Sequence, residues 1–180
     1  IVRIKSQEEN KLELSTSPHF HSGWNTKKVM WFVIISLIPA VISGIIFFGI
    51  YQLLIILVSI LFANLTEIIS QLLRKRKFTI DDGSATLTGL LLALTLPPNF
   101  SLSATAIGAI IAIGIGKQIF GGLGFNIFNP ALVGRAFLQA AFPVAITTWT
   151  IPKFNIDSVT SATPLAAFKF DKVLTSIKPL

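Results

Sequence analysis

The feature that most constrains this chain is an apolar stretch from Val29 to Ile69, in which Glu67 is the only charged residue. A helix needs about 20 apolar residues to cross the hydrocarbon core of a bilayer, so this stretch is too long for one crossing. The only plausible turn within it is Gly49 to Gln52. The sequence therefore predicts two membrane spans, Val29–Phe48 and Ile50–Ile69, joined as a tight hairpin.

The composition agrees with a chain that lies in a bilayer. Hydrophobic residues make up 52% of the sequence and charged residues 13%, with a mean hydropathy of +0.74. Soluble domains carry about 25% charged residues. The net charge of +7 comes from basic residues that flank the apolar runs, which is typical of membrane proteins and not of nucleic-acid binding. We therefore expect an all-α integral membrane protein without a nucleic-acid partner.

The absence of cysteine excludes several kinds of site within the chain. With no cysteine there is no disulfide, thiolate zinc site, Fe–S ligation or cysteine nucleophile. His19 and His21 are the only histidines, and no third ligand stands near them. The sequence therefore predicts neither a metal site nor a catalytic residue.

The later apolar segments are short and interrupted by glycine, proline and asparagine. Three of them follow the hairpin: Leu87–Leu96, Ala104–Ile115 and Ala131–Trp149. The breaks include Pro97-Pro98, the glycine-rich stretch 121–130 and Pro143. Irregular backbone at membrane depth is tolerated only where protein or a water-filled cavity satisfies it. We expect about five transmembrane helices with broken or re-entrant segments, a pattern often found around ion or ligand sites.

The basic residues also predict the orientation in the membrane. With the N-terminus in the cytoplasm, eleven basic residues lie inside and four outside, and the inverted orientation reverses that bias. This divides the chain into a cytoplasmic segment (1–28), a transmembrane domain (29–149) and an outer segment (150–180). The expected location is the cytoplasmic (inner) membrane.

Several polar residues near the predicted inner helix ends are candidates for an ion path. The ionisable ones are Glu67, Asp81, Asp82, Lys117 and Arg135. Such residues are functional candidates by default, although snorkelling or ion pairing at a helix end explains them equally well. Asn64, Asn126 and Asn129 have carbonyl oxygens that suit sodium, but we favour a role in satisfying the broken backbone.

The outer segment carries a motif for covalent modification. The tripeptide Ser-Ala-Thr ends at Thr86, Thr105 and Thr163, and only the last has an aspartate, Asp157, six residues earlier. The segment Asp157-Ser-Val-Thr160-Ser161-Ala162-Thr163 resembles the flavinylation motif D-x-x-(S/T)-(S/G)-A-T, in which a transferase joins FMN through its phosphate to the last threonine. The alternative is a capping turn before a helix, since serine, threonine and aspartate favour caps.

Four sequence blocks, in order over almost the whole chain, resemble the NqrB/RnfD family, and the RnfD type within it. The blocks are Ser17–Ser22, Thr88–Pro98, Gly121–Ala131 and Asp157–Phe168. Family members continue with a second set of spans that forms an inverted repeat with the first. The resemblance therefore implies that this chain is one half of an inverted-repeat bundle.

The resemblance also implies a function. Rnf complexes pass electrons between ferredoxin and NAD and couple this to sodium or proton movement. In that setting Thr163 carries a covalent FMN, while Asp157, Thr160, Ser161 and Ala162 are recognised by the flavin transferase; a second flavin has no location in the sequence. The partners would be other membrane and peripheral Rnf-type subunits and the lipid membrane. The alternatives are a subunit of the related NADH:quinone sodium pump, a flavin-free channel or transporter, and a scaffold subunit.

Overall fold

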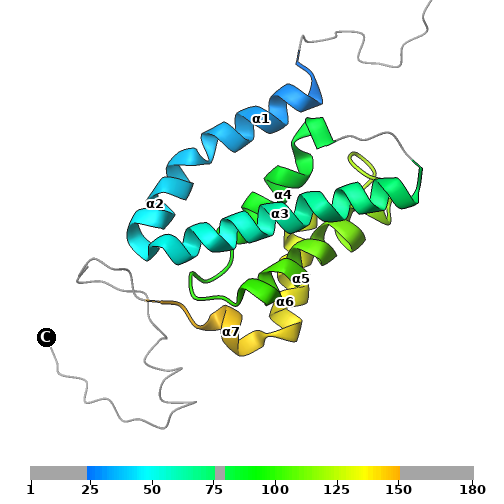
Figure 1. Cartoon of the computed structure of the whole chain (residues 1–180). Coiled ribbons are helices and arrows are strands. Elements are labelled where there is room, and N and C mark those ends of the chain that lie inside the picture. Colours follow the sequence, from blue (N-terminus) through cyan, green and yellow to red (C-terminus); the bar gives the residue numbers. More distant parts are fainter. Residues whose placement is uncertain (1–23, 76–79, 151–180) are drawn as a thin grey trace, which may run out of the picture.

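The computed structural model describes residues 24–75 and 80–150, and within these residues the regular structure is entirely helical. In chain order the helices are α1 (Thr26–Ser36), α2 (Ile38–Phe48), α3 (Ile50–Leu73), the 3₁₀ turn η1 (Ile80–Asp82), α4 (Ser84–Leu94), α5 (Leu102–Ile113), the π-helical turn η2 (Gly114–Gln118), α6 (Pro130–Ala141) and α7 (Pro143–Thr147). The predicted all-α class is confirmed, with α1 and α2 forming an arm beside the other helices (Figure 1).

The predicted hairpin is confirmed at its turn. Gly49 separates α2 from α3 with φ of 89°, a value that favours glycine because it has no Cβ. The stretches Thr26–Phe48 and Ile50–Leu73 are each long and apolar enough to cross a membrane. None of the first stretch is buried inside the protein, so its large apolar side chains suit contact with lipid.

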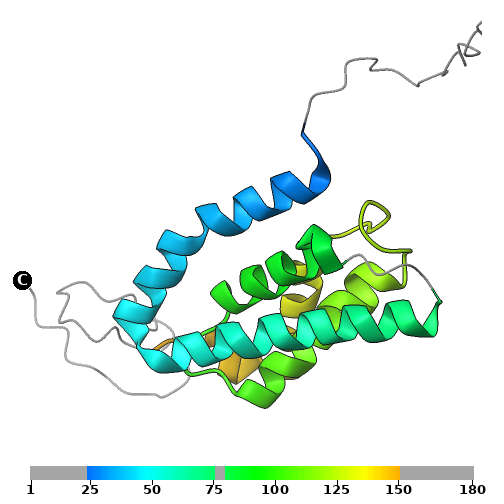
Figure 2. The same cartoon turned by 45° about the horizontal axis from the view of Figure 1, so that its top comes forward.

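The first span is not one helix, which the sequence analysis missed. It divides at Leu37, two residues before Pro39. A proline inside a helix lacks an N–H donor and its ring clashes with the carbonyl four residues earlier, so it breaks or kinks the helix. The bend between α1 and α2 is plain in Figure 2.

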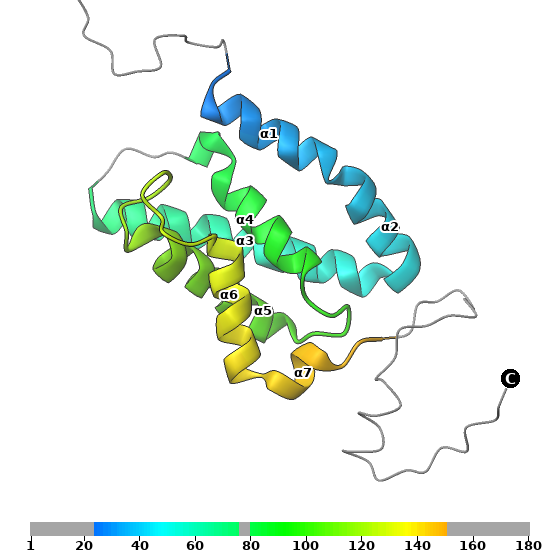
Figure 3. The same cartoon turned by 180° about the vertical axis from the view of Figure 1, so that it is seen from behind.

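The core forms where α3 packs against α4 and α5, with α6 packed on the other side of α5 (Figure 3). Small residues allow the close approach. A Cβ on Gly89 would lie 2.9 Å from the Ile60 Cα, and one on Gly134 would lie 2.7 Å from the Gly108 carbonyl oxygen. Gly108 and Gly116 are also closely packed, whereas Gly114 has only a contact of 3.9 Å with Thr66.

The short helices are shorter than a bilayer crossing. With 11 residues, α4 measures about 16 Å, against roughly 30 Å for the hydrocarbon core. The break predicted at Pro143 separates α6 from α7. The structure thus bears out the discontinuous segments that the glycine, proline and asparagine positions predict.

A buried ion pair as the candidate functional site

The described residues bring a carboxylate and an ammonium together inside the helix bundle. Glu67 lies near the end of α3 and Lys117 in the turn η2, fifty positions apart in the sequence. Lys117 Nζ is 2.6 Å from Glu67 Oε1, and the two side chains are only 2% and 1% exposed. Pairing, rather than snorkelling to the surface, therefore accounts for both residues.

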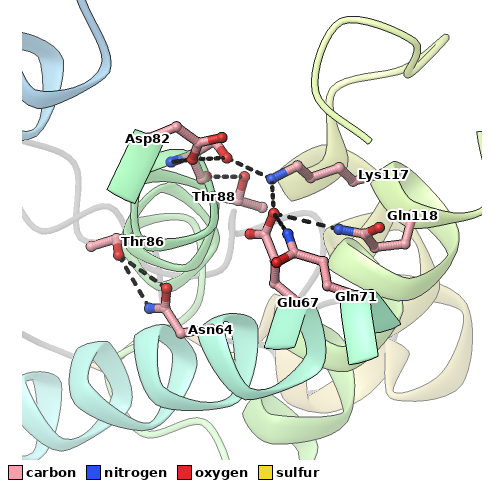
Figure 4. Close-up of polar contacts among 9 residues, drawn as sticks. Asn64, Glu67, Gln71, Asp82, Thr86, Thr88, Lys117 and Gln118 are labelled. Carbon is pink, nitrogen blue, oxygen red and sulfur yellow. Dashed lines mark hydrogen bonds and ion pairs between the residues drawn. The ribbon is translucent and has the colours of Figure 1, made fainter. Parts of the chain in front are cut away.

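Two amides share the same carboxylate oxygen with the lysine. Gln71 Nε2 donates to Glu67 Oε1 at 3.1 Å, and Gln118 Nε2 approaches it at 3.4 Å (Figure 4). The other oxygen, Glu67 Oε2, is buried and has no hydrogen-bond partner among the described residues. A buried charged group without a partner is costly, so this oxygen marks an unsatisfied position in the cluster.

A hydroxyl connects the lysine to a second carboxylate. Lys117 Nζ donates to Ser84 Oγ at 2.5 Å, and Ser84 Oγ donates to Asp82 Oδ1 at 2.6 Å. The same Asp82 oxygen accepts from the Ser84 backbone N–H at 2.8 Å, at the start of α4. Asp82 thus stabilises the positive end of the α4 dipole and closes a hydrogen-bonded chain to Glu67.

Arg135 was predicted to lie near the same helix ends as Lys117, and the structure contradicts this grouping. Its guanidinium donates to the carbonyl oxygen of Thr95, at the C-terminal end of α4, whereas Ser84 and Lys117 meet at the opposite end. A cation there complements the negative end of the helix dipole and satisfies a carbonyl that has no helical partner. Arg135 therefore stands apart from the ion pair.

The predicted role in satisfying broken backbone is confirmed for Asn126 and Asn129 but is wrong for Asn64, which lies in the unbroken helix α3. Asn129 caps α6 by accepting from the Ala131 N–H at 3.0 Å, and Asn126 donates to the Phe128 carbonyl at 2.9 Å. Asn64 donates to the Ile60 carbonyl and bonds with Thr86. In the described part of the chain no three metal-ligating side chains of His, Cys, Asp or Glu gather into a cluster.

Two hollows reach this cluster. One of about 430 Å³ is lined by Asp81, Asp82 and Lys27 among others, and Lys27 pairs with Asp81 at 3.6 Å. The other, of about 380 Å³, is lined by Ser84 and Lys117 together with residues of the loop before α6, including Asn126 and Asn129. The second has the volume of a small-molecule site. Lys117 lines only the second hollow, and Glu67 lines neither.

The proposed flavin residues Asp157, Thr160, Ser161, Ala162 and Thr163 lie outside the described residues. The structure does place the other two Ser-Ala-Thr threonines. Thr105 is fully buried in α5 and its hydroxyl donates to the Ser101 carbonyl, while the Thr86 hydroxyl in α4 bonds with Asn64. Both hydroxyls are thus engaged in hydrogen bonds, and Thr105 is buried as well.

Three members of the cluster were not predicted from the sequence: Ser84, Gln71 and Gln118. One signal was present: Gln71 lies four residues after Glu67, which places both on one face of a helix. Ser84 and Gln118 carry no comparable pattern. Their contacts with Lys117 and Glu67 depend on how α3, α4 and η2 pack, and these segments are distant in sequence.

Comparison with known proteins assigns the chain to a family. The model of the NQR2, RnfD, RnfE family matches residues 13–179. The chain is 46% identical over 162 residues to the D subunit of the proton-translocating ferredoxin:NAD(+) oxidoreductase complex of Clostridium ljungdahlii, covering 89% of this chain and 49% of that protein. It is 43% identical over 161 residues to the D subunit of the Na(+)-translocating ferredoxin:NAD(+) oxidoreductase complex of Acetobacterium woodii, covering 89% and 50%.

A more distant relative is the D subunit of the ion-translocating oxidoreductase complex of Escherichia coli, 33% identical over 189 residues and covering 87% of this chain and 54% of that protein. The chain thus spans about half the length of the curated relatives it matches. The expected resemblance is confirmed, and the chain belongs to the NQR2, RnfD, RnfE family.

Proposed function

We propose that this chain is part of the RnfD-type membrane subunit of an Rnf-type complex, which couples electron transfer between ferredoxin and NAD to cation movement across the cytoplasmic membrane. The observation that carries this proposal is the 46% identity to the Clostridium ljungdahlii protein over 89% of the chain. Two helices long enough to cross a membrane fit a membrane subunit. The chain works in a hetero-oligomer with other membrane and peripheral subunits, which supply the sites for ferredoxin and NAD.

The cation is a monovalent one, either sodium or a proton. One relative is named as proton-translocating and another as Na(+)-translocating, although both match this chain over 89% of its length. The identity to both relatives therefore does not favour one cation over the other.

The electron carrier on this chain is an FMN joined by a phosphoester to the Thr163 hydroxyl. Three Ser-Ala-Thr tripeptides occur, and the motif residues Asp157 and Thr160 precede only the last. The hydroxyls of Thr86 and Thr105 are already engaged in hydrogen bonds, which supports Thr163 as the acceptor. When bound, FMN supplies chemistry of one or two electrons, and the protein fixes its position.

In this assignment the residues of the motif have separate roles. Asp157, Thr160 and Ser161 are recognised by a flavin transferase, and Ala162 leaves room for its approach. The transferase acts on the outer face of the membrane, so residues 150–180 lie outside and the N-terminus lies in the cytoplasm.

Flavin fluorescence on a denaturing gel tests the proposal. The chain is co-expressed with a flavin transferase, and we expect a fluorescent band that survives denaturation. Thr163→Val removes the hydroxyl and abolishes the band, whereas Thr86→Val, a change in the same tripeptide on α4, leaves it unchanged. A band that persists in Thr163→Val would refute the attachment site.

A further inference from the structure

Among the described residues, this cluster has one negative charge more than its cations balance. The hydrogen-bonded chain from Glu67 through Lys117 and Ser84 to Asp82 contains two carboxylates and one ammonium. Of the neighbouring charges, Lys27 pairs with Asp81, and the exposed Arg74 donates to the Gln118 carbonyl. One monovalent cation is therefore enough to neutralise these hydrogen-bonded side chains.

The structure also shows which atom can bind that cation. Three donors converge on Glu67 Oε1, while Oε2 of the same carboxylate is buried and has no partner among the described residues. A carboxylate oxygen is a ligand that sodium accepts and a site that a proton can occupy. Glu67 Oε2 is therefore a position for either cation. This argument rests on the unpartnered oxygen and does not use the charge count.

Lys117 is placed to act between the two carboxylates. Its ammonium contacts Glu67 directly at 2.6 Å and reaches Asp82 through a single hydroxyl, that of Ser84. A lysine ammonium is a compact charge on a flexible stem of four carbons, so it can change partners by rotation of its side chain. The hollow of about 380 Å³ beside Lys117 and Ser84 gives it room to do so.

We propose that the Lys117 ammonium shifts between Glu67 and Asp82 and thereby controls access of the translocated cation to Glu67. When the ammonium is on Glu67 Oε1, it already neutralises the carboxylate, so Oε2 holds no second cation. When the ammonium moves to Asp82, a sodium ion or a proton takes its place on the Glu67 carboxylate. The net charge of the hydrogen-bonded side chains from Glu67 to Asp82 then changes from −1 to 0. This inference rests on the proposed function, because it supplies the cation site of that same complex.

The exchange has a physical advantage over a simple carboxylate site. An uncompensated charge is very unfavourable at membrane depth. Because one cation replaces another on Glu67, the carboxylate is neutralised before and after each step. A site that is always occupied also prevents cations from leaking through when no electron is transferred.

The test uses the whole complex in sealed vesicles, with cation uptake measured while ferredoxin reduces NAD. Asp82→Asn removes the second partner of the ammonium, which then remains on Glu67, so the half-saturating sodium concentration rises about tenfold. Lys117→Gln removes the competitor, so that concentration falls about tenfold and passive ²²Na⁺ leakage appears without ferredoxin. In sodium-free vesicles the same shifts appear as about one pH unit in the pH of half-maximal uptake.

A matched control separates the exchange from a long-range effect of charge. Asp81→Asn removes the same charge one residue away, from a side chain that is 92% exposed, and should behave like the wild type. Equal shifts in Asp81→Asn and Asp82→Asn, or no shift in Asp82→Asn, would overturn the inference. Asp82→Asn keeps an oxygen that can accept from the Ser84 N–H, so α4 retains its cap. If the Lys117→Gln complex does not assemble, the result for Asp82→Asn alone decides whether the inference holds.

The wild-type complex distinguishes the inference from the proposed function. If its electron transfer moves neither sodium nor protons, the proposed function itself is wrong. If it moves a cation and the Asp82 variant is indistinguishable from wild type, only the role of Lys117 is wrong.

Discussion

The ion pair between Glu67 and Lys117 should show strong energetic coupling, which a double-mutant cycle measures. The perturbations are Glu67→Gln, Lys117→Met and the combination of both, each close to the native side chain in size. At the Nζ–Oε1 distance of 2.6 Å, Coulomb's law with an effective dielectric constant of about 20 gives an attraction of roughly 6 kcal/mol. Removal of both charges from water offsets much of this attraction.

The expected pattern follows from the burial of both groups. Each single variant leaves one buried charge without its partner and should lower the free energy of unfolding by about 3–5 kcal/mol. The double variant removes both charges, so it should cost less than either single variant. Ser84 remains available to satisfy a lysine left alone, which predicts that Glu67→Gln is the milder single change.

The assay is unfolding of the chain in detergent micelles by increasing fractions of SDS, followed by tryptophan fluorescence. Trp31 is a suitable reporter because its indole N–H donates to the Asp81 carbonyl at 3.3 Å, next to Asp82 in the cluster. If the two single effects add to the double effect within about 0.5 kcal/mol, the side chains are not coupled and the reasoning is refuted.

Two further predictions concern packing and orientation. Gly89→Ala should lower the free energy of unfolding by about 1–3 kcal/mol in the same SDS titration, because its Cβ would meet backbone atoms of α3. The control is Gly44→Ala, which should be neutral or stabilising because the atom nearest to its Cβ would be 3.7 Å away. Because the sequence contains no cysteine, Ser158→Cys gives a unique label: a membrane-impermeant maleimide should modify it in intact spheroplasts, and Ser22→Cys should react only after lysis. The reverse labelling pattern would contradict the proposed orientation.

The sequence predicts the broken helices because their causes are local. Gly49 and Pro143 end helices through their own backbone chemistry, and Asn129 caps α6 through its own side chain. The bend at Leu37 has a local cause too, because Pro39 breaks the helix. It was not predicted because the apolar pattern continues through Pro39 without interruption.

The pairing within the site could not be predicted in the same way. Glu67 and Lys117 are both recognisable as ionisable residues in an apolar context, yet nothing in their positions shows that they meet. Their contact depends on how α3, α4 and η2 pack, and Ser84 is ordinary by type until that packing is known. Arg135 shows the opposite error, since it was grouped with Lys117 but lies at the other end of α4.

The wide turn η2 has a consequence for which changes in length this protein tolerates. Its bonds run from the N–H of Ile119 to the carbonyl of Gly114 and from the N–H of Gly122 to that of Lys117, five residues back in each case, one more than in an α-helix. Deletion of one residue would close this turn to α-helical spacing and leave the downstream register in place, whereas α-helical spacing of all five residues would rotate the downstream residues by about 100° relative to α5. The lysine would then leave the carboxylate although every functional side chain was retained, so the number of residues in this turn is itself part of the site.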